Sequence, residues 1–293
     1  MSLDSKYNAV TRFAPSPTGL LHLGHAYSAL IAKKQAMQRG GRFLLRIEDI
    51  DSERCKTEFE DAIYEDLSWL GLDWEMPVRR QSEHLGEYSK AISTLQGFEI
   101  LYPCFCTRKD IQSAVHAHRP RYLGPDGPLY PGTCRDLSQE ERKIRESNGD
   151  AYTLRLNMNK ALSKTSRSLQ WNDYVHGKIT ATPEIFGDVV LARKDTPTSY
   201  HLAVTLDDHL QGVTLVTRGE DLFSSTHVHR LLQNLLGLDT PDYYHHPLLT
   251  DDEGRRFAKR DKSLSLKALR DDGTSPDQIR QMVGLEHTRL GVI

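Results

Sequence analysis

Apolar residues recur along the first hundred positions in two alternating patterns, one typical of strands and the other of helices. Residues 10–14 and 42–49 are short runs rich in strand-forming side chains. Residues 24–39 and 58–72 carry apolar side chains at helical spacing, and glycines end both segments. A further helix is expected at residues 83–96. This alternation predicts a parallel sheet with crossover helices.

The pattern changes after this first part of the chain. Cysteines, prolines and glycines with little periodicity predict a loop-rich insertion, which contains short strands such as residues 152–156. The α/β pattern then resumes with apolar strands at 188–195 and 213–219 and a helix over 220–237. A charged loop and a short polar helical tail end the chain. The sequence therefore divides into residues 1–100, 101–185, 186–250 and 251–293.

The composition is that of an ordinary globular chain and sets few limits on its partners. Hydrophobic residues make up 38% and charged residues 27% of the 293 positions, which is enough for a sizeable core. The 38 basic and 40 acidic residues nearly balance, so a polyanion must meet a local basic surface. We find no run of about 18 apolar residues that would span a membrane. The start also lacks the apolar core of a secretory signal, so we expect a cytoplasmic protein without membrane contact.

The most informative motif lies between the first strand and the first helix, where residues 15–25 read PSPTGLLHLGH. Prolines stiffen the exit from the strand, and Gly19 and Gly24 allow a ligand to approach the backbone closely. The helix N-terminus presents free N–H groups and a partial positive charge, which favour a phosphate. His22 and His25 would add two imidazole donors. The spacing alone fits a rigid turn with two incidental histidines equally well.

A second cluster of chemistry-bearing residues follows in the insertion. Cys104, Cys106 and Cys134 lie close together in the sequence, which suggests a metal site rather than a disulfide framework. Thiolates suit zinc, which takes about four tetrahedral ligands. From the residues alone, the fourth ligand can be His116, His118, Tyr130 or a more distant residue. Histidine is the commoner choice, and three buried thiols without a metal are the alternative.

The stretch RFAPSPTGLLHLGHA at residues 12–26 resembles the first signature of the class I aminoacyl-tRNA synthetases, in the form of their glutamyl branch. The segment KRDKS at residues 259–263 resembles the second, lysine-rich signature, with Asp261 where a serine is common. The resemblance implies an α/β fold, with a Rossmann-like parallel sheet and crossover helices. Residues 1–100 and 186–250 would form the two halves of a nucleotide-binding catalytic domain. The connective insertion, with a zinc site at 101–135, would separate them, and the lysine loop would follow.

This resemblance assigns roles to single residues. The ATP-binding and catalytic residues that it implies are His22, Gly24, His25, Lys259 and Lys262. The glutamate contacts that it implies are Arg12, Ala14, Ser16, Glu48, Tyr200 and Arg218. Arg12 would hold a substrate carboxylate through a bidentate fork, and Glu48 would receive the α-ammonium group. The acidic pair at 207–208 is interpreted as structural.

The resemblance also implies two metal ions. Mg²⁺ would accompany ATP and help to neutralise the charge that develops on the phosphate oxygens. One structural Zn²⁺ would be bound by the set found in a short glutamyl relative, which here corresponds to Cys104, Cys106, Tyr130 and Cys134.

The length and the cysteine pattern favour a short branch of this family that lacks an anticodon-binding domain. Val204 is apolar where full-length glutamyl enzymes usually carry an asparagine. By resemblance, such an enzyme activates L-glutamate with ATP, without tRNA. It then transfers the glutamate to the queuosine base at the wobble position, in the anticodon loop, of tRNA(Asp). We expect it to act as a monomer.

Two other functions remain open from the sequence. One is a minimal glutamyl-tRNA synthetase that charges a tRNA 3′ end, and the other is a non-catalytic zinc-containing RNA-binding module. Candidate phosphate contacts are Arg119, Arg121, Arg193, Lys194, Arg255 and Arg256. Each of these side chains fits a solvated surface charge as well, so the sequence does not choose among them.

Overall fold

A parallel sheet forms the centre of the computed structural model, which describes residues 8–117, 123–165, 168–249 and 265–285. Its parallel strands lie in the order β3, β2, β1, β11, β12. Their bounds are β1 (Val10–Phe13), β2 (Arg42–Ile47), β3 (Glu75–Arg80), β11 (Leu215–Gly219) and β12 (Asp242–His246). The Thr214 N–H joins β1 to β11 by donating to the Val10 carbonyl at 3.0 Å. The predicted parallel sheet is therefore confirmed.

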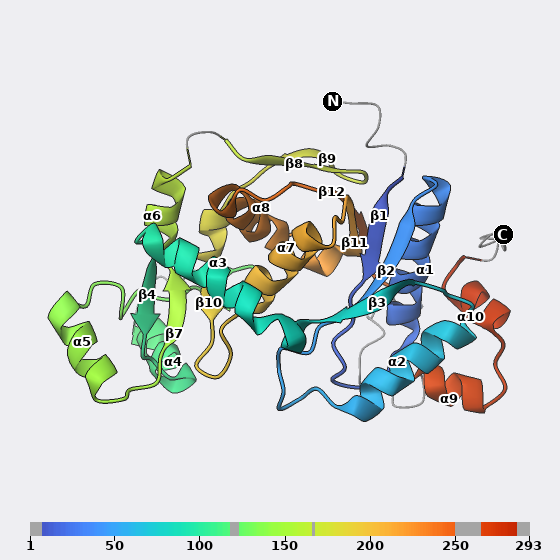
Figure 1. Cartoon of the computed structure of the whole chain (residues 1–293), viewed down its shortest axis with the longest axis horizontal. Helices are drawn as coiled ribbons and strands as arrows, with labels where there is room; N and C mark the ends of the chain where they lie inside the picture. Colours follow the sequence, from blue (N-terminus) through green and yellow to red (C-terminus); the bar gives the residue numbers. More distant parts are fainter. Residues whose placement is uncertain (1–7, 118–122, 166–167, 250–264, 286–293) are drawn as a thin grey trace.

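Helices cover both faces of this sheet, as the strand–helix alternation predicts. Figure 1 shows α1 (Leu23–Gln38) and α2 (Thr57–Trp69) on one side of it, and α7 (Tyr200–Leu210) and α8 (Ser225–Leu236) on the other. α1 faces the sheet with Ala26, Ala29, Ala32 and Ala36, each at most 1% exposed. These small side chains let the helix pack closely on β1 and β2. Two short helices, α9 (Leu266–Asp271) and α10 (Pro276–Met282), add Leu266 and Ile279 to the hydrophobic core that α1 and α2 form with the sheet.

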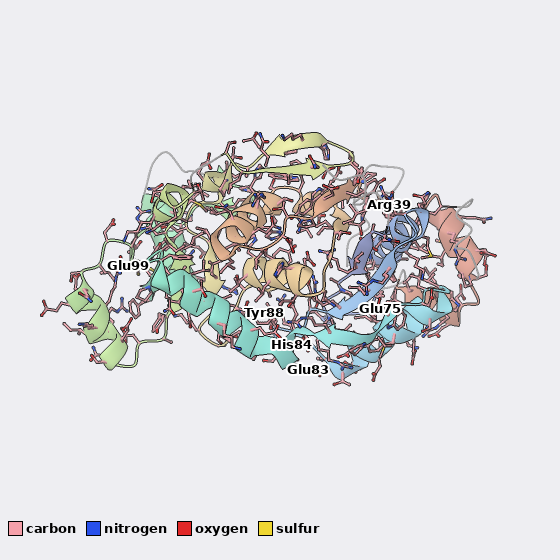
Figure 2. The ribbon with its side chains drawn as sticks, turned by 45° about the horizontal axis from the view of Figure 1, so that its top comes forward. Arg39, Glu75, Glu83, His84, Tyr88 and Glu99 are labelled. Carbon is pink, nitrogen blue, oxygen red and sulfur yellow. The ribbon has the colours of Figure 1, made fainter. Side chains whose placement is uncertain are left out.

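The insertion is built on a second, antiparallel sheet in the order β10, β7, β4. Its strands are β4 (Leu101–Cys104), β7 (Thr153–Leu156) and β10 (Val190–Ala192). The remaining elements around it are α4 (Arg108–Ala117), the hairpin of β5 (Leu123–Gly124) and β6 (Gly127–Pro128), α5 (Gln139–Ser147) and α6 (Met158–Ser163). Helix α3 (Leu85–Gly97) runs from the parallel sheet to the insertion, with Tyr88 on its course and Glu99 just beyond its end (Figure 2).

Three expectations about elements were wrong or incomplete. The run at 188–195 forms β10, which pairs antiparallel with β7 rather than resuming the parallel sheet, because a short apolar run does not specify its partner strand. β3 and β12 were not predicted, since both carry mostly polar residues. The insertion holds helices where a loop-rich segment was expected. Its hairpin of β8 (Gln170–Asp173) and β9 (Gly177–Thr180) returns to the main sheet and pairs with β12.

Short 3₁₀ turns complete the described structure: η2 (Gln81–His84), η3 (Pro183–Phe186) and η4 (Glu220–Leu222). None of the helices in the described part of the chain is long and apolar enough to cross a membrane.

Candidate active site

A cleft of about 790 Å³ lies at the carboxyl ends of β1 and β11. This is the point where the strand order of the sheet reverses, which is where open parallel sheets bind ligands. The cleft is lined by every predicted ATP or glutamate residue that the structure describes: Arg12, Ala14, Ser16, His22, Gly24, His25, Glu48, Tyr200 and Arg218. Lys259 and Lys262 lie outside the described residues. The fold thus brings together side chains that are up to two hundred positions apart in the sequence.

The two histidines of the motif begin helix α1. Nδ1 of His22 accepts the Gly24 N–H at 3.1 Å, and Nδ1 of His25 accepts the His22 N–H at 3.2 Å. Because Nδ1 is the acceptor in each neutral ring, Nε2 carries the proton. A Cβ atom on Gly24 would lie only 3.0 Å from Cε1 of His22, so glycine leaves room for this ring. The helix N-terminus and the two imidazoles form a site suited to phosphate.

The segments on either side of the lysine-rich signature border the same histidines. Leu249 lines the cleft just before residues 250–264, which lie outside the described structure. Just after them, Ser265 forms a β-bridge with His22, and the Leu266 N–H donates to the Leu21 carbonyl at 2.8 Å. The chain therefore reaches the cleft just before the lysine segment and is bonded to the start of α1 just after it.

Arg12 is held differently from the free bidentate fork that we expected. Its Nε and one terminal nitrogen donate to the two carboxylate oxygens of Asp208, at 2.9 and 3.2 Å. Its other terminal nitrogen donates to the Thr217 carbonyl at 3.1 Å. The side chain is only 4% exposed. The fork of Arg12 is thus occupied by a protein carboxylate, and only its remaining N–H groups can serve a ligand.

Glu48 supplies a negative charge to the same cleft. It follows β2, and its carboxylate accepts from the buried Arg46 side chain at 3.0 Å. Burial raises the pKa of Glu48, although Arg46 and Arg12 oppose this effect. Arg46 also donates to Asp208 at 2.7 Å. Asp208, one of the acidic pair at 207–208, therefore holds Arg12 and Arg46 in place. Because Arg46 also contacts Glu48, Asp208 and Glu48 belong to one ion network.

Arg218 lies one residue before the end of β11 and is the second buried arginine of the cleft, with an exposed fraction of 5%. Its Nε donates to His245 at 3.1 Å, and one terminal nitrogen donates to Thr226 at 2.6 Å. The other terminal nitrogen has longer contacts of 3.4 Å to Tyr200 and His229. No carboxylate of the described residues lies within ion-pair distance of it. A buried cation without a counter-ion is costly, so the cleft favours an anionic group at this position.

Sequence reasoning missed the residues that hold Arg218. Thr226 and His229 on α8 follow it by 8 and 11 positions, and His245 on β12 follows it by 27. Nothing in the local pattern marks them, because a histidine or threonine in a half-buried helix or strand is usually a packing residue.

The cysteine cluster lies in the insertion, at the end of β4. The Sγ atoms of Cys104, Cys106 and Cys134 lie within 4.8 Å of one another. The Tyr130 hydroxyl is 3.3 Å from Cys104 and 3.6 Å from Cys106. His116 is exposed, and its Nδ1 contacts a carbonyl of its own helix, that of Gln112, at 2.6 Å. His118 lies outside the described residues.

The chemistry of this cluster fits a metal ion. Burial raises the pKa of the Cys106 thiol to about 11, and the neighbouring thiols add to this effect. Burial also disfavours the Cys104 thiolate, but hydrogen bonds from Tyr130 and Arg155 lower its pKa overall. Three soft sulfur donors and a phenol gathered at one point are a donor set that could bind a metal such as zinc.

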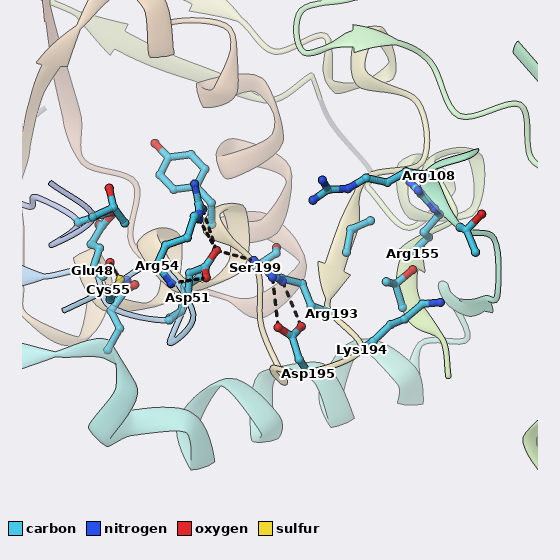
Figure 3. A pocket seen from close by; sticks show the side chains of 18 of the residues that line it. Glu48, Asp51, Arg54, Cys55, Arg108, Arg155, Arg193, Lys194, Asp195 and Ser199 are labelled. Atoms are coloured by element: carbon cyan, nitrogen blue, oxygen red, sulfur yellow. Dashed lines mark hydrogen bonds and ion pairs between the residues drawn. The ribbon is translucent and has the colours of Figure 1, made fainter. Parts of the chain in front are cut away.

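A second hollow of about 770 Å³, which we call the groove, connects the cleft to the cysteine cluster. It shares Ser16, Thr18, Glu48 and Tyr200 with the cleft, and Cys106 lies on its lining. Its basic side chains are Arg54, Arg108, Arg155, Arg193 and Lys194. Asp51 pairs with Arg54 and Arg193, and Asp195 pairs with Arg193 (Figure 3). The exposed Arg108 and Lys194 lie apart from these pairs.

A Rossmann-like sheet with this histidine motif at its switch point is the catalytic domain of a class I tRNA synthetase. The family model described as tRNA synthetases class I (E and Q), catalytic domain, matches residues 8–290, and the chain belongs to this family. It is 49% identical over 285 residues to the Glutamyl-Q tRNA(Asp) synthetase of Rhodobacter capsulatus, an alignment that covers 94% of this chain and 100% of that protein. The chain is therefore an enzyme of the ligase type, and the resemblance read from its first motif is confirmed.

Two further comparisons agree with this assignment. The Glutamyl-Q tRNA(Asp) synthetase of Symbiobacterium thermophilum is 41% identical, over 92% of this chain and 83% of that protein. The crystal structure of glutamate-tRNA synthetase from Elizabethkingia anophelis superposes with a TM-score of 0.79 at 28% identity. That match covers 95% of this chain and 61% of the other chain.

Proposed function

We propose that this protein activates L-glutamate with ATP, without tRNA, and transfers the glutamate to the queuosine base at the wobble position of tRNA(Asp). One observation carries the amino-acid part of the proposal. Among the described residues, the cleft places Arg218, a buried cation without a counter-ion, and Glu48, a carboxylate that is 11% exposed, beside a helix N-terminus suited to phosphate. The names of the relatives support the RNA part.

Glutamate fits this distribution of charge. Its side-chain carboxylate would meet Arg218 and the Tyr200 hydroxyl, and its ammonium group would meet Glu48. The N–H groups of Arg12 that Asp208 leaves over would add donors, and Ala14 and Ser16 would contribute from the turn that follows β1. Arg218 and Tyr200 would thus recognise the γ-carboxylate. A shorter side chain would not reach them, and an uncharged one would not neutralise Arg218.

The chemistry of activation requires alignment and charge neutralisation more than covalent assistance. An oxygen of the α-carboxylate attacks the α-phosphorus of ATP, pyrophosphate leaves, and glutamyl-adenylate forms. Nε2–H of His22 and of His25 and the N-terminus of α1 would stabilise the phosphate oxygens. We assign Lys259 and Lys262 to the same task, because Leu249 before their segment lines the cleft and Ser265 after it pairs with His22. Mg²⁺ bound with ATP would neutralise further phosphate charge.

We propose that the cysteine cluster binds one structural Zn²⁺ through Cys104, Cys106, Tyr130 and Cys134. A zinc ion bound by four protein ligands has no open position for substrate. Its contribution here would be to hold the end of β4 and the loop around Tyr130 beside the groove.

The groove is the surface that we assign to RNA. It joins the cleft directly, and its exposed basic side chains suit a phosphodiester backbone. Among the candidate phosphate contacts, Arg193 and Lys194 line it, while Arg119, Arg121, Arg255 and Arg256 lie outside the described residues. The anticodon loop of tRNA(Asp) would enter here, toward glutamyl-adenylate. Binding should then weaken steeply with salt.

The arrangement of the chain follows from this assignment. Residues 1–100 and 186–250 would act as the halves of the catalytic domain, 101–185 as the insertion that bears the zinc site, and 251–293 as the signature loop and tail. We propose that a monomer carries out both steps in the cytoplasm.

Two measurements test the proposal. The first is exchange of radiolabelled pyrophosphate into ATP, with L-glutamate and without tRNA, where glutamine and aspartate serve as controls. We expect exchange when glutamate is the amino acid, and no exchange with glutamine or aspartate. The second is mass spectrometry of nuclease-digested tRNA(Asp) after incubation with glutamate and ATP. Glutamate on the modified base supports the proposal, whereas an alkali-labile 3′ ester on tRNA(Glu), or absence of exchange, refutes it.

A further inference from the structure

The guanidinium of Arg218 is held along one edge by neutral groups. Its Nε–H donates to Nε2 of His245 at 3.1 Å, and its adjacent terminal nitrogen donates to the Thr226 hydroxyl at 2.6 Å. Arg12 uses the same two donor positions, but there they meet the carboxylate of Asp208. The hydrogen bonds at Arg218 therefore fix the orientation of its guanidinium, but its positive charge is not neutralised by them.

The hydrogen-bond directions define the state of His245. An arginine nitrogen can only donate, so Nε2 of His245 must be the acceptor and carry no proton. The proton of the neutral ring then lies on Nδ1, which faces the Asp173 carboxylate. Asp173 and His245 side chains are both 0% exposed. The second oxygen of Asp173 accepts the backbone N–H groups of Val175 and His176, at 2.8 and 3.1 Å.

These contacts form a directed chain across three strands. Asp173 ends β8, His245 lies on the neighbouring β12, and Arg218 lies on β11 next to it. His245 and Arg218 are direct register partners in the parallel pair. The arrangement is rigid, because each residue lies on a paired strand within the sheet. The loop after β8 also fixes the Asp173 carboxylate through its backbone N–H groups.

We propose that Asp173 and His245 are positioning residues for amino-acid binding. Asp173 keeps the proton of His245 on Nδ1, so that Nε2 aims the Arg218 guanidinium into the cleft as an unneutralised cation. The inference rests on the proposed glutamate site and adds two residues that do not themselves contact glutamate. A carboxylate in place of His245 would occupy Arg218 as Asp208 occupies Arg12, and a protonated imidazole would repel it. A neutral acceptor is the group that orients this cation and leaves its charge for the substrate.

The first test observes the ring directly. The intact protein is labelled with ¹⁵N-histidine, and the His245 signals are assigned by their loss in H245Q. At pH 7 we expect the ¹⁵N shifts of a neutral ring protonated at Nδ1. A ring protonated at Nε2, or a charged imidazolium, overturns the inference whatever the enzyme's activity proves to be.

The second test separates positioning from general structural support. In the glutamate-dependent pyrophosphate exchange, Asp173→Asn and His245→Leu should raise KM for glutamate by about tenfold or more, because a charged hydrogen bond is misaligned. KM for ATP should stay within twofold of the wild-type value. His245→Gln keeps an acceptor near the position of Nε2 and should recover most of the loss. His209→Gln is the matched control, because His209 faces Asp239 at 3.2 Å on the outside of α7, away from the cleft.

The outcomes distinguish this inference from the proposed function. If the wild-type protein shows no glutamate-dependent exchange, the proposed function fails, and the labelling experiment still decides the state of His245. If the wild type exchanges and both Asp173→Asn and His245→Leu leave KM for glutamate unchanged, the positioning role is wrong. It is equally wrong if KM for ATP and for glutamate rise together. Should His245→Leu fail to fold, Asp173→Asn, which preserves side-chain volume, gives the same decision.

Discussion

The carboxyl ends of β1 and β11 carry two buried arginines with opposite surroundings. Arg12 is 4% exposed and Arg218 is 5% exposed, and both line the same cleft. Arg12 gives its fork to Asp208, whereas Arg218 meets a neutral imidazole and a hydroxyl. Burial alone therefore does not distinguish a structural cation from a ligand-binding one. The charge of the group that the arginine contacts distinguishes the two.

The contrast has an energetic basis. A buried ion pair contributes little net stability, but breaking it by removing one partner is costly. A buried cation without a counter-ion destabilises the free protein, and an anionic ligand relieves that cost. Arg12 therefore helps to hold β1 against α7, and we propose that Arg218 keeps its charge for a substrate.

The largest expected effect is on stability at the β1 end. Asp208→Asn removes the carboxylate that Arg12 and Arg46 share, and should lower the free energy of unfolding by about 3–5 kcal/mol. Denaturant unfolding followed by circular dichroism measures this change. Asp239→Asn, whose side chain is 90% exposed, is the control and should change stability by at most about 0.5 kcal/mol. Equal small effects of both substitutions would show that the Arg12 network is not structural.

The next effect is on binding at the β11 end. Arg218→Gln should lower kcat/KM for glutamate in pyrophosphate exchange by about 100-fold or more, because the substrate carboxylate loses its charged partner. Stability should stay the same or rise, since a buried unneutralised charge is removed. Arg218→Lys keeps the charge but loses the planar fork, so it should recover only part of the activity. A large loss of stability with unchanged KM for glutamate would reverse the roles assigned to the two arginines.

Removal of the proposed zinc ion should affect a third region and leave both arginines unchanged. The Arg155 guanidinium lies 3.9 Å over the Tyr130 ring and also lines the groove, so loss of this ion would misplace a basic side chain of the proposed RNA surface. We expect chelation, or Cys104→Ser, to lower transfer to tRNA by about tenfold. KM for glutamate in the exchange assay should not change. Equal losses in both reactions would place the cluster within the amino-acid site.

The last expected effect is a difference in acid sensitivity between the surroundings of Arg12 and those of Arg218. Burial lowers the pKa of His245 from 6.5 to about 4, so the folded state favours the neutral ring, and stability is lost as the pH falls from 6.5 toward 4. Burial acts to raise the pKa of Asp208, but Arg12 and Arg46 lower it below 3.8 overall. Its contribution is therefore lost only below that pH.

Free energies of unfolding measured against pH can separate the pH range in which His245 titrates from the more acidic range in which Asp208 titrates. Between pH 6.5 and 4, the wild-type curve should be steeper than that of His245→Gln by about 1.4 kcal/mol per pH unit. Asp208→Asn should differ in slope from the wild type only at more acidic pH. Parallel curves for the wild type and His245→Gln would mean that His245 is not buried as a neutral ring.

The sequence predicted the parts of the fold that have a regular apolar pattern. The strands around residues 10–14, 42–49 and 213–219 and the helices after them are present, because strands and helices of the core have distinct periods. β3 and β12 escaped prediction, since their residues are mostly polar and their pairing in the sheet overrides weak local preference. Partner choice, as for β10, depends on contacts that no local pattern records.

The site shows the same limit. His22, His25 and Arg12 could be proposed because a continuous motif marks them, and the described residues that the resemblance implies for ATP and glutamate all line one cleft. Asp173 and His245 could not be found, since their role exists only through geometry across three strands. The sequence also placed a bidentate fork on Arg12 without showing that Asp208, which is 196 positions away, would occupy it.

The most direct test of the contrast between the two arginines is a crystal structure of the wild-type protein with L-glutamate bound. We expect the γ-carboxylate within hydrogen-bond distance of the Arg218 guanidinium, the ammonium group at Glu48, and the fork of Arg12 still on Asp208. A glutamate held by Arg12 after it has released Asp208, with Arg218 left without an anionic partner, would contradict the account.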